Sequence, residues 1–402
     1  MLSDVRAFDP SERRARLARR HHLGPGMQAA DVESATAAMV CLHATDPATV
    51  YVSAWARVND LTVADLDKAM YVDRSLVKHL AMRRTLFVFP RGSLGAVQAG
   101  ASARVADAES RRLIREVEKA GLFENGEQWL AQASAAVLAA LADGREATSS
   151  ELRAEITLLE GTITYGEGRS WGGEAPIGPR VLTALSAGGQ IVRGSNRGGW
   201  TVSRPRWVST RAWLGRDIEV LDPAEARAVL VREWLRAFGA GTLDDVRWWL
   251  GSTLGAVRTA LVDVGAVEVD LHGKTGYVLP DDLDPVEPVE PWAALLPGLD
   301  PTTMGWFDRG WYLGAHRSAV FDSTGNGGAT AWWDGRIVGG WSQTESGEVF
   351  VQPLEDLDAD ARGSLDKEAA RLTEWLAGVR VSQRFPSPLS KSLPTKQPES
   401  RG

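Results

Sequence analysis

Cysteine is almost absent from the chain, since Cys41 is the only one among 402 residues. A single thiol excludes an intramolecular disulfide and any zinc site built from several thiolates. Cys41 stands in the apolar run 39–42, so we expect it to lie in the core. The six histidines are scattered and form no spaced pair with carboxylates of the kind that metal hydrolases use. We therefore expect neither a metal nor another cofactor.

Long apolar runs are also missing. No uninterrupted apolar segment approaches the roughly 18 residues that a membrane helix needs. The N-terminal part carries five arginines between Arg13 and Arg20, but the apolar stretch that should follow the basic region of a secretory signal does not come after them. We expect a cytoplasmic protein that has no membrane partner.

The net charge of -7 is unevenly distributed along the chain. Residues 281–290 hold five acids and no base, whereas the segment from Arg169 to Arg211 holds seven arginines and one glutamate. Nucleic-acid binding depends on lysines and arginines that face phosphates, so a local basic face matters more than the total. The pattern predicts a basic module next to an acidic, proline-rich linker.

One order of elements occurs three times along the first 280 residues. Each time, helical periodicity or a capping signal predicts three helices, and β-rich segments follow. The predicted segments are 31–44, 51–70, 75–81 and 85–90; then 128–142, a helix opened by Thr148 to Glu151, 178–187, 190–193 and 199–202; then 224–237, a helix opened by Thr242 to Asp245, 254–262, 266–271 and 276–279. Three helices closed by a two-stranded wing define a winged helix, whose third helix usually enters the DNA major groove. The alternative is a generic α+β chain in which helices and hairpins alternate by chance.

The C-terminal part differs in composition. Residues 292–352 are rich in tryptophan and glycine and contain short alternating segments, which predict strands at 311–314 and 329–333. Asp334-Gly335 is a tight hairpin signal. A helix is predicted over 355–378, and the polar tail from residue 381 is predicted to be disordered.

The predicted fold class is therefore α+β, with tandem winged-helix modules followed by a small β-barrel. The predicted domains are 1–120, a first winged-helix module with an N-terminal basic helix; 121–215, a second module; 216–285, a third module; 286–380, the β-barrel domain with its C-terminal helix; and 381–402, the disordered tail.

Several segments together resemble the AlkZ/YcaQ-like winged-helix DNA glycosylases. They are His43-Ala-Thr-Asp-Pro47, Trp55-Ala-Arg57, Met82-Arg-Arg-Thr-Leu86, Leu295-Leu-Pro297, Asp300-Pro301, Trp311-Tyr-Leu-Gly314 and Asp334-Gly-Arg-Ile-Val-Gly-Gly-Trp341. The resemblance implies three winged-helix motifs and a β-barrel that form a concave DNA-binding surface. It also implies hydrolysis of the N-glycosidic bond of N7-alkylated purines, with bulky or crosslinked purines among the candidates, in double-stranded DNA. The protein would act as a monofunctional, nucleoid-associated monomer with no obligate protein partner.

The resemblance places the catalytic pair just after the first long helix. The family pairs a glutamine with a second glutamine or an aspartate, one apolar residue apart, and the matching positions here are His43 and Thr45 around Ala44. An unperturbed imidazole has a pKa of about 6.5, so a neutral His43 can accept a proton from a water that the Thr45 hydroxyl orients. Asp46 adds a negative charge nearby. The alternative is structural: His43 caps the helix and Asp46-Pro47 turns the chain.

DNA contacts are expected from a basic set and from the tip of the predicted barrel hairpin. The set is Arg83, Arg84, Arg180, Arg193, Arg197, Arg204, Arg206, Trp333, Asp334, Gly335 and Arg336. The alternative for the arginines is a solvated basic face. Most of the sixteen tryptophans are expected in the core, and of Trp332 and Trp333 one should pack while the other faces outward.

Two other functions remain open. Winged helices more often read operators than repair bases, so a transcription regulator is one alternative. Three different modules in one chain disfavour it, because they present one asymmetric surface where a dimeric repressor needs symmetry. The other is a non-catalytic protein that binds damaged DNA, which is motivated by the residue types at positions 43 and 45.

Overall fold

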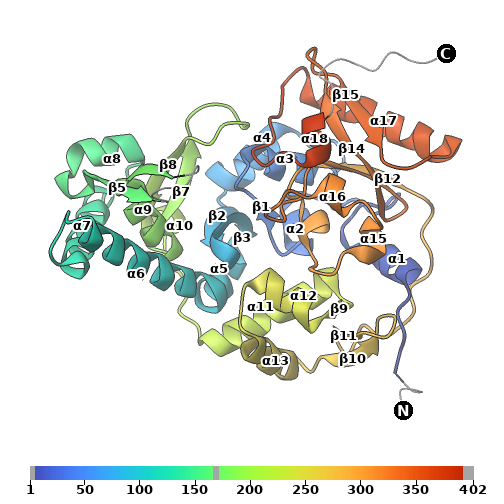
Figure 1. Cartoon of the computed structure of the whole chain (residues 1–402), viewed down its shortest axis with the longest axis horizontal. Helices are drawn as coiled ribbons and strands as arrows, with labels where there is room; N and C mark the ends of the chain where they lie inside the picture. The colour runs from blue at the N-terminus through green and yellow to red at the C-terminus, as the bar shows by residue number, and fades with distance from the viewer. Residues whose placement is uncertain (1–4, 166–171, 393–402) are drawn as a thin grey trace. The chain divides into compact units, whose positions relative to one another are not determined.

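A computed structural model describes residues 5–165 and 172–392 of the chain (Figure 1). These residues form two compact units: unit 1 consists of the residues up to 69 and from 228 onward, and unit 2 of residues 70–227. Helices and antiparallel strand pairs occur in both units, so the expected mixture of α and β structure is confirmed. In the part of the chain that the structure describes, no helix is long and apolar enough to cross a membrane.

Unit 2 contains helices and three small groups of strands. Its elements are β2 (Leu76–Ala81), a 3-10 turn (Met82–Arg84), β3 (Thr85–Pro90), α5 (Leu94–Val97), α6 (Ala103–Lys119), α7 (Gly126–Ala140), β4 (Ala147–Thr148), α8 (Ser149–Glu155), β5 (Thr162–Tyr165), β6 (Gly173–Pro176), α9 (Gly178–Ala187), β7 (Ile191–Asn196), β8 (Pro205–Ser209) and α10 (Thr210–Leu214).

The elements from α7 to β8 reproduce the second predicted repeat. Thr148 caps α8, and the Thr148 and Glu151 side chains form the predicted capping box. The strands are ordered β4-β8-β7, so the strand before α8 pairs with the last strand of the hairpin. The prediction of a strand at 199–202 is wrong, because these residues belong to the connection between β7 and β8.

The core of unit 2 holds the helices against this hairpin. Trp129 of α7, Val181 of α9, Ile191 of β7 and Trp207 of β8 are buried in one cluster. The Trp129 ring stacks on Phe123 at 4.8 Å between centroids, and its indole N–H donates to a backbone carbonyl, which satisfies the buried donor. The position of α9 relative to the hairpin is thus set by apolar packing.

Unit 1 contains the remaining elements. They are α1 (Pro10–Arg20), α2 (Val32–Ala38), β1 (Leu42–His43), α3 (Pro47–Trp55), α4 (Val63–Asp67), α11 (Pro223–Phe238, which begins before the unit boundary), β9 (Gly241–Thr242), α12 (Leu243–Leu250), α13 (Leu254–Asp263), β10 (Val267–Asp270), β11 (Thr275–Val278), β12 (Ala293–Leu296), α14 (Pro301–Met304), α15 (Gly310–Leu313), α16 (Arg317–Val320), β13 (Thr330–Trp333), β14 (Arg336–Gln343), β15 (Val349–Pro353), α17 (Ala359–Leu376) and α18 (Pro388–Ser392).

The elements from α11 to β11 repeat the arrangement seen in unit 2. Thr242 and Asp245 form the predicted capping box at the start of α12. The strands are ordered β10-β11-β9, so the strand before the second helix again pairs with the last strand of the hairpin. The third predicted repeat therefore has the helix and strand order that its sequence pattern indicates.

The predicted closed β-barrel is not found among the described residues. Strands β12, β13, β14 and β15 form an open antiparallel sheet in that order. The helix α17 packs against β12, β13 and β15, so a helix covers one face of the sheet.

Three predicted elements are wrong for local reasons. The helix predicted over 31–44 ends at Ala38, and Val40 then has a φ of 63°, which a helix does not allow. The segment 75–81 is not a helix but strand β2, which pairs along its whole length with β3. The segment 311–314 is not a strand but lies in the short helix α15 and its C-cap.

The acidic segment 281–290 is not a free linker, because it contacts the basic helix α1. Arg16 and Arg20 both pair with the carboxylate of Asp282. Arg16 and Arg19 also donate to backbone carbonyls of Asp284 and Glu287. Asp282 therefore pairs with two arginines of α1, and the backbone of the acidic segment accepts hydrogen bonds from the same helix.

Candidate active site and nucleic-acid interface

The segment from His43 to Asp46 connects β1 to α3. Asp46 is the N-cap of α3, and its carboxylate accepts a hydrogen bond from the N–H of Ala48 at 3.3 Å. Pro47 takes the first helical position, where the missing N–H costs nothing. Asp-Pro therefore fixes the start of α3, as the structural interpretation of this dipeptide expects, and Asp46 itself has extended backbone angles.

His43 is buried at 8% exposure, and Thr45 is half-buried beside it. The Nδ1 atom of His43 accepts a hydrogen bond from the N–H of Thr45 at 3.4 Å. This bond is longer than the usual range of about 2.7–3.2 Å for an N–H donor, so it is a weak one. The segment thus holds an imidazole and a hydroxyl within two residues of each other, next to a carboxylate.

Asp46 is also buried, at 8% exposure. Burial raises the pKa of its carboxyl, because the charged form loses hydration. Hydrogen bonds from the backbone N–H groups of Arg384 and Ala48, together with the charge of Arg384, lower the pKa and oppose this effect. The Asp46 carboxylate is therefore buried, and two backbone N–H groups and the charge of Arg384 partly compensate its negative charge.

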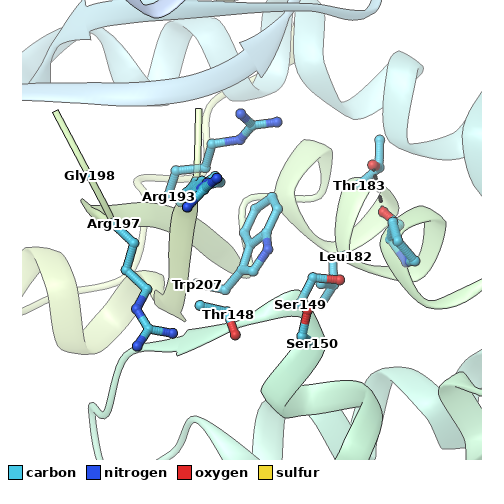
Figure 2. A pocket seen from close by; sticks show the side chains of 12 residues that line it. Thr148, Ser149, Ser150, Leu182, Thr183, Arg193, Arg197, Gly198 and Trp207 are labelled. Atoms are coloured by element: carbon cyan, nitrogen blue, oxygen red, sulfur yellow. Dashed lines mark hydrogen bonds between the residues drawn. The ribbon is translucent and has the colours of Figure 1, made fainter. Parts of the chain in front are cut away.

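Unit 2 carries an open pocket of about 870 Å³ between α8, α9 and the β7–β8 hairpin (Figure 2). Figure 2 shows Arg193 and Arg197 on one side of Trp207, and Leu182 and Thr183 of α9 on the other. The guanidinium of Arg193 lies 5.3 Å from the centre of the Trp207 ring. The pocket is also lined by Thr148, Ser149, Ser150, Pro179, Gly198, Arg204 and Pro205. Three of the predicted DNA-binding arginines therefore line one concave surface.

The tip of the β7–β8 hairpin is held by the side chain of Asn196. Its Nδ2 donates to the carbonyls of Gly199 and Val202, and its Oδ1 accepts from the N–H of Arg204. The N–H of Arg197 donates to the carbonyl of Arg204 at 2.8 Å. Arg197 and Arg204 are therefore exposed side chains on an ordered turn, an arrangement that suits contacts with phosphates.

In a comparison with protein-family models, residues 36–375 match the family described as "DNA glycosylase AlkZ-like". The chain belongs to this family. The resemblance expected from the sequence is confirmed, and membership makes the chain a DNA repair glycosylase, a hydrolase that acts on N-glycosyl bonds.

Among solved structures, the chain is similar to the DNA glycosylase AlkZ of Streptomyces sahachiroi. The two share 22% sequence identity with a TM-score of 0.73, and the match covers 95% of this chain and 99% of that one. At this identity the likeness shows the fold. No curated protein matches the chain by sequence.

The remaining predicted arginines lie in different surroundings. Arg180 of α9 forms an ion pair with Glu116 of α6, and Arg206 lies opposite Thr148 where β8 pairs with β4.

Arg83 and Arg84 lie in the turn between β2 and β3, and both have positive φ angles. Arg84 pairs with Glu109 of α6 at 2.8 Å. Arg180 and Arg84 thus each pair with a carboxylate of α6, and Arg180 shares its partner Glu116 with Arg112. Arg169 lies outside the described residues.

The β13–β14 hairpin turns at Asp334 and Gly335, whose φ angles of 46° and 74° fit the tight turn that this dipeptide predicts. Gly335 is buried, and a Cβ there would come within 2.6 Å of the Arg14 side chain. Arg336 pairs with Glu355 at 2.8 Å. Of the four hairpin residues predicted to contact DNA, Asp334 and Arg336 are exposed and Trp333 is half-buried. Their contact with DNA stays a prediction.

Two of the motifs that carry the family resemblance meet in the core of unit 1. The side chains of Arg57 and Asp300 are both 0% exposed and form an ion pair at 2.8 Å. Asp300 caps α14 through the N–H of Thr302, and Arg57 also donates to the Thr302 hydroxyl. Arg57, which follows the C-cap of α3, thus joins this end of the helix to α14.

Arg384 is a residue of the site that the sequence did not predict. It lies in the tail predicted to be disordered, yet residues 381–392 have defined contacts and include α18; residues 393–402 lie outside the described part of the chain. The backbone N–H of Arg384 donates to Asp46 at 3.1 Å. The apolar residues Phe385 and Leu389 among the polar ones are the sequence signal that points to packing in this segment.

Proposed function

We propose that the chain hydrolyses the N-glycosidic bond of N7-alkylated purines in double-stranded DNA, bulky or crosslinked purines among them. It would act as a monomer on the DNA of the nucleoid in the cytoplasm, without a metal or other cofactor. The observation that carries this proposal is the burial of His43 and Asp46 around the half-buried Thr45, at the position where the family resemblance places the catalytic pair.

The chemistry of the substrate makes modest demands on these residues. N7 alkylation gives the purine a positive charge, so when the bond between C1′ and N9 breaks, its electron pair neutralises the departing base. The sugar is left positive, and the oxygen of a water molecule bonds to C1′ while its proton passes to an acceptor. His43 and Thr45 would place that water and His43 would accept the proton, while the carboxylate of Asp46 would stabilise the positive sugar.

The strand orders support a winged-helix interpretation of the two repeats from α7 to β8 and from α11 to β11. In each, three helices precede a hairpin, and the short strand after the first helix pairs with the last strand. A helix-turn-helix variant of this kind presents its third helix to the major groove. On this proposal α9 faces DNA, and Arg193, Arg197 and Arg204 contact the phosphates. The predicted domain boundaries at 120, 215, 285 and 380 belong to the same proposal.

A second candidate is a non-catalytic protein that binds damaged DNA. It is favoured by one observation, which is that His43 and Thr45 occupy positions where the family pairs glutamine with glutamine or aspartate. The two candidates differ in whether a free base appears.

The test incubates the purified protein with a duplex oligonucleotide that contains one N7-methylguanine, in the presence of a metal chelator. Release of free N7-methylguanine, with none from an unmodified duplex of the same sequence, supports the glycosylase. Tight binding to the modified duplex without release supports the binding-only alternative.

A further inference from the structure

After α17 the chain continues over unit 1 as a segment that we name the C-terminal strap, residues 379–392. Its first part is tied to β14 through Gln343, whose side chain is 5% exposed. The Nε2 of Gln343 donates to the carbonyl of Val379 at 3.0 Å, and its Oε1 accepts from the N–H of Val381 at 2.8 Å. A buried amide thus holds the strap at its start.

The second part of the strap is packed into unit 1. Ser387 is 1% exposed and Leu389 is 9% exposed. A Cβ at Gly328 would come within 2.4 Å of Ser387, and one at Gly340 within 2.7 Å of Leu389, so these glycines make room for the strap. The strap therefore has two fixed ends.

Arg384 lies between these two ends and contacts the candidate catalytic segment. Its backbone N–H donates to Oδ2 of Asp46 at 3.1 Å, and its Nη1 donates to the carbonyl oxygen of Thr45 at 3.4 Å. The guanidinium also lies 5.8 Å from the centre of the Phe385 ring. One residue of the strap thus holds both Thr45 and Asp46.

We propose that Arg384 is a positioning residue of the active site, and that the C-terminal strap holds the Asp46 carboxylate ionised and aimed at the reacting sugar. This inference rests on the proposed function. The strap begins after residue 375, where the match to the family model ends, so the family resemblance does not supply this role.

The electrostatics of Asp46 agree with this role. Two backbone N–H groups, of Ala48 and Arg384, donate to the Asp46 carboxylate, and the positive charge of the Arg384 guanidinium acts on it. The ring of His43, another titratable group, lies on the same segment and accepts from the N–H of Thr45. Burial raises the pKa of Asp46, whereas the N–H bond and the charge of Arg384 lower it. Loss of Arg384 must therefore raise the pKa further, so that less carboxylate is present at a given acidic pH.

The experiment compares the wild type with Arg384→Pro, Arg384→Ala and the control Arg380→Ala. Proline removes the backbone N–H and the charge, and alanine removes the charge alone. Arg380 is an exposed arginine of the same strap. We measure single-turnover release of N7-methylguanine from duplex DNA between pH 5 and pH 8, and we follow the Asp46 carboxyl by carbon-13 NMR.

Arg384→Pro should slow release near neutral pH about tenfold, the reduction expected when a hydrogen bond to a charged group is removed. The acidic limb of its pH profile should move to higher pH. Arg384→Ala should show smaller changes in the same direction, and Arg380→Ala should match the wild type.

Wild-type rates and an unshifted acidic limb in both Arg384 variants would overturn the inference while leaving the glycosylase proposal intact. If the proline variant fails to fold, the alanine variant decides. If the wild type releases no base, the proposed function fails and the catalytic role of Arg384 fails with it. The NMR titration then still decides whether Arg384 controls the ionisation of Asp46.

Discussion

Asp46 has two roles, as the N-cap of α3 and as a buried carboxylate of the candidate site. As the N-cap of α3 it is a favoured residue in either ionisation state, since asparagine caps equally well. As a buried carboxylate it has a raised pKa. The folded protein then binds the proton more tightly than the unfolded chain, so stability falls as the pH rises from the unfolded pKa through the folded one. Keeping this carboxylate ionised at neutral pH therefore costs stability, as is common for functional residues.

The variant Asp46→Asn separates these roles. It removes the charge and keeps one acceptor oxygen, which can cap α3 through the N–H of Ala48, while an NH2 group replaces the Oδ2 that accepts from the Arg384 N–H. Removal of the buried charge and loss of one hydrogen bond oppose each other, so its melting temperature at pH 7 should stay close to that of the wild type. Its excision rate should fall about a hundredfold, the usual effect of removing a group that stabilises developing charge. Thermal melts and single-turnover excision check both expectations. A clearly less stable variant with unchanged excision would assign Asp46 a purely structural role.

The variant Asp300→Ala tests how much the buried Arg57–Asp300 ion pair contributes to the stability of the fold. Both side chains of the Arg57–Asp300 pair are fully buried, so Asp300→Ala leaves an uncompensated guanidinium and should cost about 3–5 kcal/mol of unfolding free energy. The matched control is Glu368→Ala, which breaks a partly exposed pair with Arg371 and should cost less than about 1 kcal/mol. Denaturant titrations measure both. Equal decreases in the two variants would show that the buried pair has no special role.

At the scale of elements, the β7–β8 hairpin and α9 make the best-defined candidate DNA surface. Arg193 and Arg197 line its pocket, and the guanidinium of Arg197 lies 3.6 Å from a carboxylate oxygen of Glu151. Replacing both with alanine should lower the slope of log K against log salt by about 0.9 for each phosphate that the variant no longer neutralises. Fluorescence anisotropy with undamaged duplex measures the slope, and Arg112→Ala in α6 serves as the control because Arg112 already pairs with Glu116 and belongs to no predicted DNA contact. A slope unchanged by the double substitution would place the DNA-binding surface elsewhere.

The elements that the sequence predicts correctly are those with their own local signals. The capping boxes at Thr148 and Thr242 form as expected, because both partners lie within one helical turn. The prediction for segment 75–81 is wrong, since its conformation depends on pairing with β3 and its own residues show no clear period. The order of the strap around Arg384 escapes prediction for a related reason: it comes from Gln343 and Asp46, which are distant in sequence.

The candidate site is predictable only in part, for the same physical reason. The position of His43 and Thr45 comes from the family resemblance, and the structure adds their burial and their neighbours. The grouping of Arg193, Arg197 and Arg204 at one pocket depends on the turn that Asn196 organises. The ion pair of Arg180 with Glu116 joins two helices, and no spacing rule within one segment reveals such a partner.

At the scale of the whole molecule, a net charge of -7 is compatible with DNA binding because arginines in different parts of the chain have different partners. Arginines of α1 are neutralised by the acidic segment around Asp282. Arg197 and Arg204 of unit 2 are instead exposed and line a concave surface. On the proposed function, unit 2 supplies the DNA affinity and the His43 segment of unit 1 supplies the chemistry.

This division of roles is tested most directly by one measurement: single-turnover release of N7-methylguanine by wild type, His43→Ala and Thr45→Ala, alongside their affinities for undamaged duplex. Help from a general base is typically worth about 10²- to 10⁴-fold. The excision rate of His43→Ala should fall by that factor and that of Thr45→Ala by less, while all three proteins bind undamaged duplex with equal affinity. Equal excision rates in all three proteins would contradict this division of roles.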